Sequence, residues 1–416
     1  MYRFLITIFC LVIFLRQYLK SQVLSSTSIF CLCYFLIFVI YPASVNTSFN
    51  NANLIDKCAL AGIICYAVGL FFGSNIKVNS IKNNKNINFP PFLLSSFLFF
   101  VCFFVSMFFV FRFYGMDAIR KLIAGGVTVR ELSLSINSVN LFSFSQHTMI
   151  PCILCMWMSA KNKKHRIVSI IAIVLYVLES IFLSFTRIFL ISIILIIFFY
   201  ELRKASRKKQ VLFSLIGVVS VILLMVIMNY IRCLGLSYEL DLKTILNIDV
   251  IFESTDFAAS YNMLDKLLDF KSPYISLLVY LKPIFVLIPR SIWPLKPESL
   301  NVQVMRYIDS IAAANGLSSG ISVLGEGYAT LSFFGMFSSC LFWGIICAYL
   351  DKRYYDRLSN ENSISVKNIY YYIFAIFIII SAQRGDWSVY LSIILYFYFL
   401  PIFVLSKIKY KVNKNE

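Results

Sequence analysis

Three arginines stand at the ends of apolar segments, where a guanidinium group can reach a ligand at a membrane surface. Arg187 follows the break Ser184-Phe185-Thr186, Arg290 lies in a proline-rich segment, and Arg384 separates two closely linked apolar segments. A guanidinium fork binds two phosphate oxygens at once. Taken singly, each arginine could also simply extend its side chain to the membrane interface or pair with an acid such as Asp386. Three of them on one face of a membrane favour a diphosphate ligand.

The proline-rich segment is Ile288-Pro289-Arg290-Ser291-Ile292-Trp293-Pro294-Leu295-Lys296-Pro297. Each proline fixes φ and removes a backbone donor, so we predict that this segment is stiff and non-helical. Lys296 adds a second positive charge, and Trp293 offers an aromatic surface to a substrate. Charges that are held in place beforehand stabilise an anion as it forms.

Glu326 is the candidate general base. It lies in Leu324-Gly325-Glu326-Gly327-Tyr328, ahead of an apolar segment, and its flanking glycines allow close backbone approach. The carboxylate could take a proton from a sugar hydroxyl, or it could be an acid that the dipole favours at a helix N-terminus. Tyr328, Arg306 and His147 are further candidates for substrate contact, although His147 also fits a packed helix residue.

Signatures of a metal or cofactor are missing from the sequence. It contains no phosphate-binding glycine loop, dinucleotide fingerprint or HExxH pair. Nearly all of the 11 cysteines lie in apolar segments, and Cys152 and Cys155 are one turn apart within one of them. We therefore expect no cofactor and no metal.

The composition indicates that lipid, rather than water, surrounds most of the chain. Of 416 residues, 60% are hydrophobic and 14% are charged, whereas soluble domains carry about 25% charged residues. We predict an all-α, polytopic membrane protein with about eleven spans of roughly 20 residues or slightly fewer. The predicted spans are Tyr2–Leu15, Thr27–Val45, Cys58–Ile76, Pro91–Phe111, Val139–Ala160, Ile167–Phe185, Arg187–Tyr200, Val211–Asn229, Ala329–Leu350, Ile369–Ala382 and Trp387–Ser406.

The basic residues in alternate connections predict the orientation of these spans. One set of connections holds more than half of the 38 lysines and arginines and few acids. This set is predicted to be cytoplasmic, which places the N-terminus outside and the C-terminus inside. The formal net charge of +18 is then a topology signal, and we expect no nucleic-acid binding. The set comprises residues 16–26, 77–90, 161–166, 201–210, 351–367 and the tail after 406.

Three regions follow from this topology. Residues 1–229 hold about eight helices, residues 230–328 form a large loop on the outer, non-cytoplasmic side, and residues 329–416 hold about three helices. A loop of this length is predicted to be functional. Its apolar segment 274–293 is interrupted by two prolines next to basic residues, so we predict that it is re-entrant or interfacial.

Residues 288–297 resemble the PRxxWPxKP signature of bacterial oligosaccharide repeat-unit polymerases, the Wzy-type O-antigen or capsule polymerases. Gly325-Glu326-Gly327-Tyr328 followed by Phe334-Gly335 resembles that family's glycine–glutamate segment, and Arg384-Gly385 and the late outer loop are similar too. Some members carry Arg-x10-Gly in two outer loops. Here Arg306 and Gly316 come nearest, one residue too close together.

The resemblance implies a GT-C-like, metal-independent glycosyltransferase in the bacterial inner membrane. Its substrates would be oligosaccharides linked to undecaprenyl diphosphate, and the growing glycan would move from its carrier to a new lipid-linked repeat unit. A Wzx-type flippase and a Wzz-type chain-length regulator would be its partners.

The resemblance also implies roles for the candidate residues. Arg187, Arg290, Lys296 and Arg384 would hold diphosphates, and Arg290 would also stabilise the departing carrier. Glu326 would deprotonate the acceptor hydroxyl. Acids in the first half of the large loop would hydrogen-bond sugars.

Two other functions remain open on the sequence. An O-antigen ligase, or another lipid-linked glycosyltransferase, would need the same arginines for the same carrier. A lipid-linked oligosaccharide flippase is the third interpretation, but transporters usually show paired repeats and charges near the midplane, and this chain has few charges within its apolar segments.

Overall fold

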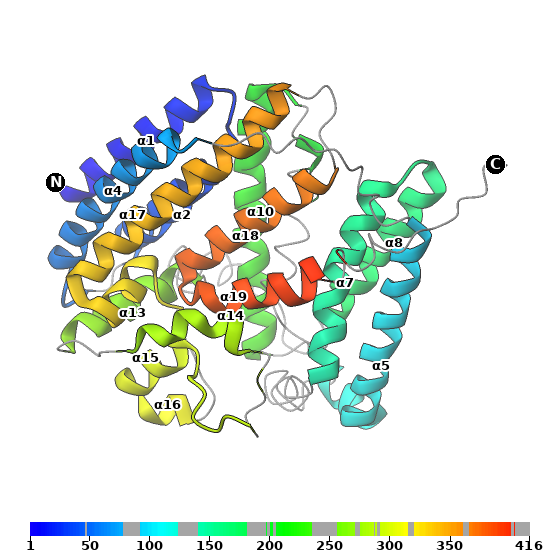
Figure 1. Cartoon of the computed structure of the whole chain (residues 1–416). Coiled ribbons are helices and arrows are strands. Elements are labelled where there is room, and N and C mark those ends of the chain that lie inside the picture. Colours follow the sequence, from blue (N-terminus) through cyan, green and yellow to red (C-terminus); the bar gives the residue numbers. More distant parts are fainter. Residues whose placement is uncertain are drawn as a thin grey trace. The chain divides into compact units, whose positions relative to one another are not determined.

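The computed structural model of the chain describes residues 1–45, 48–77, 92–123, 140–180, 197, 200–202, 205–234, 256–270, 275–286, 288, 292–314, 320–360, 366–400 and 403. Every regular element among these residues is helical (Figure 1). The helices are α1 (Tyr2–Leu19), α2 (Ser26–Phe35), η1 (Leu36–Ile40), α3 (Tyr41–Ser44), α4 (Ala52–Asn75), α5 (Phe92–Ile123), α7 (Asn140–Ser159), α8 (Lys163–Glu179), α10 (Arg207–Leu234), α13 (Asp256–Asp269), η3 (Leu277–Leu281), α14 (Lys282–Phe285), α15 (Leu300–Ile308), α16 (Ser310–Ala314), α17 (Val323–Asn360), α18 (Val366–Arg384), α19 (Trp387–Ile393) and η4 (Ile394–Phe399).

Five stretches of helix in the described part are long and apolar enough to cross a bilayer. They are Tyr2–Leu19, Ser26–Ser44, Ala52–Asn75, Phe92–Arg112 and Val323–Asp356, and two shorter apolar helices cover Ile369–Arg384 and Trp387–Phe399. Large apolar side chains such as Phe71, Phe97 and Phe104 are exposed on them, as lipid contact requires. The chain is therefore an all-helical, membrane-embedded protein, which confirms the predicted fold class at this level.

The described residues divide into two compact units, and the first comprises Met1–Ser80, Leu202–Ile222 and Leu246–Ser392. Its main internal interface is between α4 and α17, which lie side by side in Figure 1. A side-chain carbon on Gly69 would lie 2.2 Å from the carbonyl oxygen of Leu341, and one on Gly73 would lie 2.5 Å from that of Ile345. The GxxxG spacing of these glycines therefore serves close helix packing, as it does in other membrane proteins.

A buried carboxylate joins three helices of this unit. Asp351 of α17 accepts hydrogen bonds from the backbone amides of Ser26 at 2.8 Å and Thr27 at 3.1 Å. The hydroxyls of Ser26 and Tyr372 donate to the same carboxylate, each at 2.6 Å. The first amides of a helix have no intrahelical partner, so Asp351 satisfies the start of α2 and ties it to α18.

Within the large loop, the described helix α13 packs on η1 and α4. On α13, Asp265 accepts hydrogen bonds from the amides of Asn50 and Asn51, at 3.3 and 2.8 Å. Asp269 accepts from the side chain of Asn51 at 2.8 Å. These two acids of the loop's acidic half thus hold α13 in place.

The second unit comprises Ile81–Glu201, Leu223–Ile245 and Ile393–Glu416. Its described helices α5, α7, α8 and η4 contact one another. Glu179 on α8 is buried, and it accepts hydrogen bonds from Ser106 on α5 and, at 3.2 Å, from Gln146 on α7. Hydrogen bonds of this kind hold a carboxyl group between apolar helices.

Candidate functional site

The helix that carries Glu326 is broken near its start. Leu331 and Ser332 leave the helical conformation, and Ser332 has a φ of 56°. A side-chain carbon on Gly327 would lie 2.3 Å from the carbonyl oxygen of Gly335. Eight residues of straight helix would separate those two glycines by ~12 Å, so the chain folds back on itself here. The first turns of α17 form a short helix that lies against the long one.

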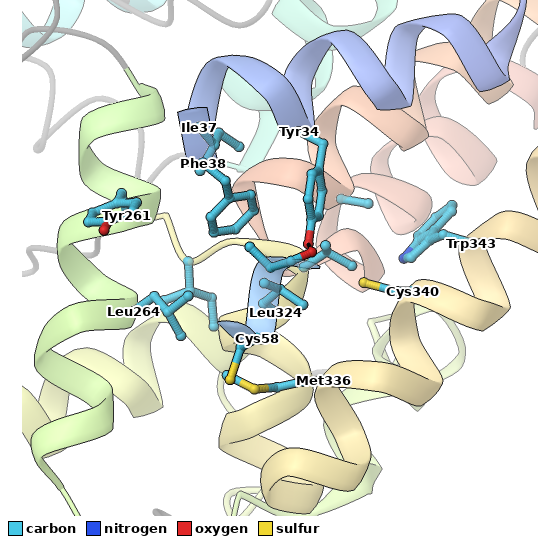
Figure 2. Close-up of a cluster of buried hydrophobic side chains, with 14 of the residues drawn as sticks. Tyr34, Ile37, Phe38, Cys58, Tyr261, Leu264, Leu324, Met336, Cys340 and Trp343 are labelled. Carbon is cyan, nitrogen blue, oxygen red and sulfur yellow. Dashed lines mark hydrogen bonds between the residues drawn. The ribbon is translucent and has the colours of Figure 1, made fainter. Parts of the chain in front are cut away.

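Leu324 anchors this short helix in the core of the first unit. Figure 2 shows its side chain among Tyr34 of α2, Cys58 of α4 and Leu264 of α13. The side chain of Leu324 is fully buried, and burial of a leucine stabilises by about 1.5–3 kcal/mol. The residues on either side of Leu324 are thereby fixed in position.

Glu326 is held by the turn that joins α18 to α19. Its side chain is 2% exposed, and its Oε2 accepts a hydrogen bond from the backbone amide of Asp386 at 3.1 Å. Its Oε1 is buried and has no partner among the described residues. A buried oxygen without a donor costs free energy, so this atom is the candidate acceptor for a ligand hydroxyl.

The turn owes its shape to two residues with positive φ, Gly385 at 82° and Asp386 at 58°. A side chain on Gly385 would lie 2.1 Å from the carbonyl oxygen of Ile321. Only glycine combines this φ with so close an approach. The turn therefore sits directly on the segment that leads into α17, which brings the amide of Asp386 to Glu326.

Arg384 and Asp386 flank Gly385 in this turn. A side-chain carbon on Gly320 would lie 2.7 Å from Cγ of Arg384, so the arginine side chain lies across Gly320. Asp386 is buried, and its carboxylate accepts a hydrogen bond from the hydroxyl of Ser388 at 3.0 Å. Burial raises the pKa of the Asp386 carboxyl, whereas the positive charge of Lys282 lowers it.

A pocket of about 270 Å³ opens beside Glu326. The ring of Trp387 stacks on Tyr280 at 5.5 Å between centroids and meets Trp343 edge-on at 6.0 Å. Phenol and indole rings of this kind supply flat apolar surfaces, and the hydroxyls nearby supply hydrogen bonds. The pocket is lined by Tyr280, Val323, Glu326, Thr330, Leu331, Gly335, Ser338, Ser339, Phe342, Trp343 and Trp387.

Lys296 and Trp293, from the proline-rich segment, contact residues at or just before the start of that segment. Nζ of Lys296 donates to the carbonyl oxygens of Val286 at 3.2 Å and Ile288 at 3.0 Å. The ring of Trp293 packs edge-on against Phe285 at 4.9 Å. Arg290 itself lies outside the described residues.

The remaining candidates are spread over the chain. Arg306 is exposed and pairs with Glu298 at 2.7 Å, and Tyr328 is buried with its ring edge-on to Phe333 at 5.3 Å. His147 belongs to the second unit, where it is buried with its ring 5.1 Å from that of Phe397. Arg187 lies outside the described residues.

Of the residues singled out in the sequence, the structure therefore brings the segment around Glu326 together with the turn of Arg384. Sequence reasoning overlooked Asp386 as part of the site, and it overlooked Tyr280 and Trp387. The only signal for the latter was the position of Trp387 directly after Arg384-Gly385-Asp386. Within the described ranges, no three residues among His, Cys, Asp and Glu come together as metal ligands.

The fold and this site define an all-helical membrane protein with an aromatic pocket and a buried carboxylate at the pocket wall. No family model, curated protein or solved structure matches the chain.

Proposed function

We propose that this protein polymerises oligosaccharide repeat units linked to undecaprenyl diphosphate, forming O-antigen or capsular polysaccharide. In this proposal it is a GT-C-like glycosyltransferase of the bacterial inner membrane, acting at the outer face. It has about eleven spans, a periplasmic N-terminus and a cytoplasmic C-terminus. The resemblance of residues 288–297 and of the Glu326 segment supports the family.

The observation that carries the proposal is the position of Glu326 at the wall of the aromatic pocket. Its Oε2 is fixed by the amide of Asp386, and its Oε1 has no partner among the described residues. Trp387, Trp343 and Tyr280 give the pocket the apolar surface that the C–H face of a sugar ring needs. Thr330, Ser338 and Ser339 provide hydroxyls. The pocket suits the sugar that accepts the growing glycan.

The proposed reaction uses Glu326 as the base. Its carboxylate takes the proton of the acceptor hydroxyl, and the hydroxyl oxygen bonds to the anomeric carbon of the donor glycan. The bond from that carbon to the lipid diphosphate breaks, and the diphosphate leaves with the electron pair. A general base contributes about 10²–10⁴-fold to such a step.

Cations complete the proposed mechanism. Negative charge grows on the diphosphate as the bond breaks, and fixed guanidinium groups stabilise it most in the transition state. Among the described residues, Arg384 is the candidate cation. It directly precedes the glycine of the turn that holds Glu326. Arg187, Arg290 and Lys296 are proposed to share the task, and a flippase and a chain-length regulator are the proposed partners.

Deleting the gene tests the proposal. Loss of a polymerase leaves surface glycan with a single repeat unit. Full-length polymer that accumulates on the lipid carrier would identify a ligase instead, and repeat units trapped on the inner face would identify a flippase. Wild-type polymer in the deletion strain would reject all three functions.

A further inference from the structure

We infer that the pocket beside Glu326 accepts an uncharged pyranose ring and rejects sugars that carry a carboxylate. The inference rests on the proposed function, because it specifies the acceptor sugar of that reaction. It concerns the pocket alone and makes no use of the arginines.

The size of the pocket limits its ligand to one small ring. Pockets for drug-sized ligands measure about 300–1,000 Å³, and this one measures about 270 Å³. Two bulky rings, Trp343 and Phe342, take part in its wall, and Trp387 is fixed between Tyr280 and Trp343. A single terminal residue of a glycan can enter, and the next sugar along the acceptor must lie outside.

The charge of the pocket decides which sugars can enter. Among the described residues that line it, none is Lys, Arg or His, and the ionisable groups are Glu326 and the phenol of Tyr280. A second acid, Asp386, contacts Glu326 through its backbone amide, and the basic residue whose charge acts on Asp386, Lys282, does not line the pocket. A ligand carboxylate would therefore be buried without a positive partner, which is strongly unfavourable.

A neutral sugar meets the opposite situation. One of its hydroxyls can donate to Oε1 of Glu326, which has no partner among the described residues. Others can bond with the hydroxyls of Ser338 and Ser339, which line the same wall. The hydrogen bond to Oε1 removes the cost of a buried acceptor without a donor. The pocket therefore favours binding of a neutral ring and disfavours binding of an anionic ring.

The test compares ligands that differ only in charge. Full-length protein in phospholipid nanodiscs is mixed with methyl pyranosides of the gluco, galacto and manno series, each as the hexoside, the hexuronamide and the hexuronate. Binding is measured by saturation-transfer difference NMR. The amide and the acid have nearly the same shape, so we expect the preferred series to bind as hexoside and hexuronamide and at least about tenfold more weakly as hexuronate.

Two variants locate the binding. Ser339→Phe fills the pocket and should abolish the signals of the neutral ligands, whereas Trp157→Phe, in the second unit, should leave them unchanged. A hexuronate that binds as well as its amide, with a signal that Ser339→Phe removes, would overturn the inference. So would a panel in which no neutral pyranoside binds. Because these measurements require no turnover, they fail or succeed separately from the gene deletion that tests the polymerase.

Discussion

The backbone amide of Asp386 donates a hydrogen bond to Oε2 of Glu326 at 3.1 Å. This bond connects the short helix at the start of α17 with the turn between α18 and α19. The donor is a backbone group, so a side-chain substitution at residue 386 does not remove it. It fixes one carboxylate oxygen of Glu326, whereas Oε1 has no partner among the described residues.

Glu326→Gln is expected to abolish polymerisation while substrate binding persists. Glutamine keeps an oxygen that can accept from the amide of Asp386, but its amide cannot take a proton from the acceptor hydroxyl. Loss of a general base lowers the rate by about 10²–10⁴-fold. The assay is polymer formation from lipid-linked repeat units by purified protein, with binding of the repeat unit measured in parallel. Normal activity would remove Glu326 as the base.

Glu298→Gln is the matched control for that variant. Glu298 pairs with the exposed Arg306, and surface ion pairs contribute about 0–1 kcal/mol. We expect near-normal stability and activity from Glu298→Gln, so that loss in Glu326→Gln alone identifies chemistry at that position.

Arg384→Ala and Arg384→Lys are both expected to shorten the polymer strongly while the protein still inserts. A lysine keeps the charge but not the planar fork that binds two phosphate oxygens. The same result is expected for Arg290→Ala and Arg290→Lys. Polymer length is read from surface glycan on a gel, and insertion from the amount of protein in the membrane fraction. Wild-type polymer from the lysine variants would contradict a bidentate diphosphate contact.

Gly320→Ala tests the same arginine without changing it. Its new methyl group would lie 2.7 Å from Cγ of Arg384 and 2.9 Å from the carbonyl oxygen of that residue. The arginine side chain must shift, so activity should fall while its charge stays. Arg353→Lys, at a helix residue whose guanidinium donates to Tyr349, serves as the control for arginine replacement in general.

Several helices were predictable from the sequence because they are long apolar runs. Thr27–Val45 was expected and Ser26–Ser44 is found; Pro91–Phe111 was expected and Phe92–Arg112 is found. The span expected to begin at Ala329 differs, because its helix begins at Val323 and breaks at Leu331 and Ser332. An apolar pattern shows which residues avoid water, but it does not predict that Ser332 adopts a positive φ.

The site was predictable as residue types but not as an assembly. Glu326 and Arg384 stood out because glycines accompany both in otherwise apolar surroundings. The hydrogen bond that holds Glu326 at the turn next to Arg384 is donated by the backbone amide of Asp386, and every residue except proline has such an amide. The partners of Lys296 could not be predicted for the same reason. The carbonyl oxygens that it binds belong to Val286 and Ile288, two residues without any polar side chain.

Gly327→Ala is expected to destabilise the protein severely, whereas Gly325→Ala should be tolerated. A methyl group on Gly327 would lie 2.3 Å from the carbonyl oxygen of Gly335, which is backbone and has no room to yield. On Gly325 the nearest atom is a side-chain carbon of Ile321 at 3.3 Å. The two variants add the same methyl group to the same short helix, at positions two residues apart. Thermal unfolding in detergent, followed by the loss of soluble protein, compares them directly. Equal stability would contradict the folded-back start of α17.

Asp351→Asn is expected to destabilise the first unit without touching the pocket. Asp351 accepts from two backbone amides and two hydroxyls. An asparagine offers one oxygen, and its NH₂ group faces donors, so at least one buried donor loses its partner. Hydrogen bonds to a charged group contribute about 1.5–3 kcal/mol, so we expect a loss of at least about 2 kcal/mol. Unfolding of the purified protein in detergent measures this loss of stability.

Asp356→Asn provides the comparison for that loss, because Asp356 lies on the same helix and is exposed. Its stability should stay near that of the wild type. Variant Tyr372→Phe removes one of the donors to Asp351 and keeps the ring, so it should cost less than Asp351→Asn. If Asp351→Asn were as stable as Asp356→Asn, the carboxylate would not be what ties the start of α2 to α17 and α18.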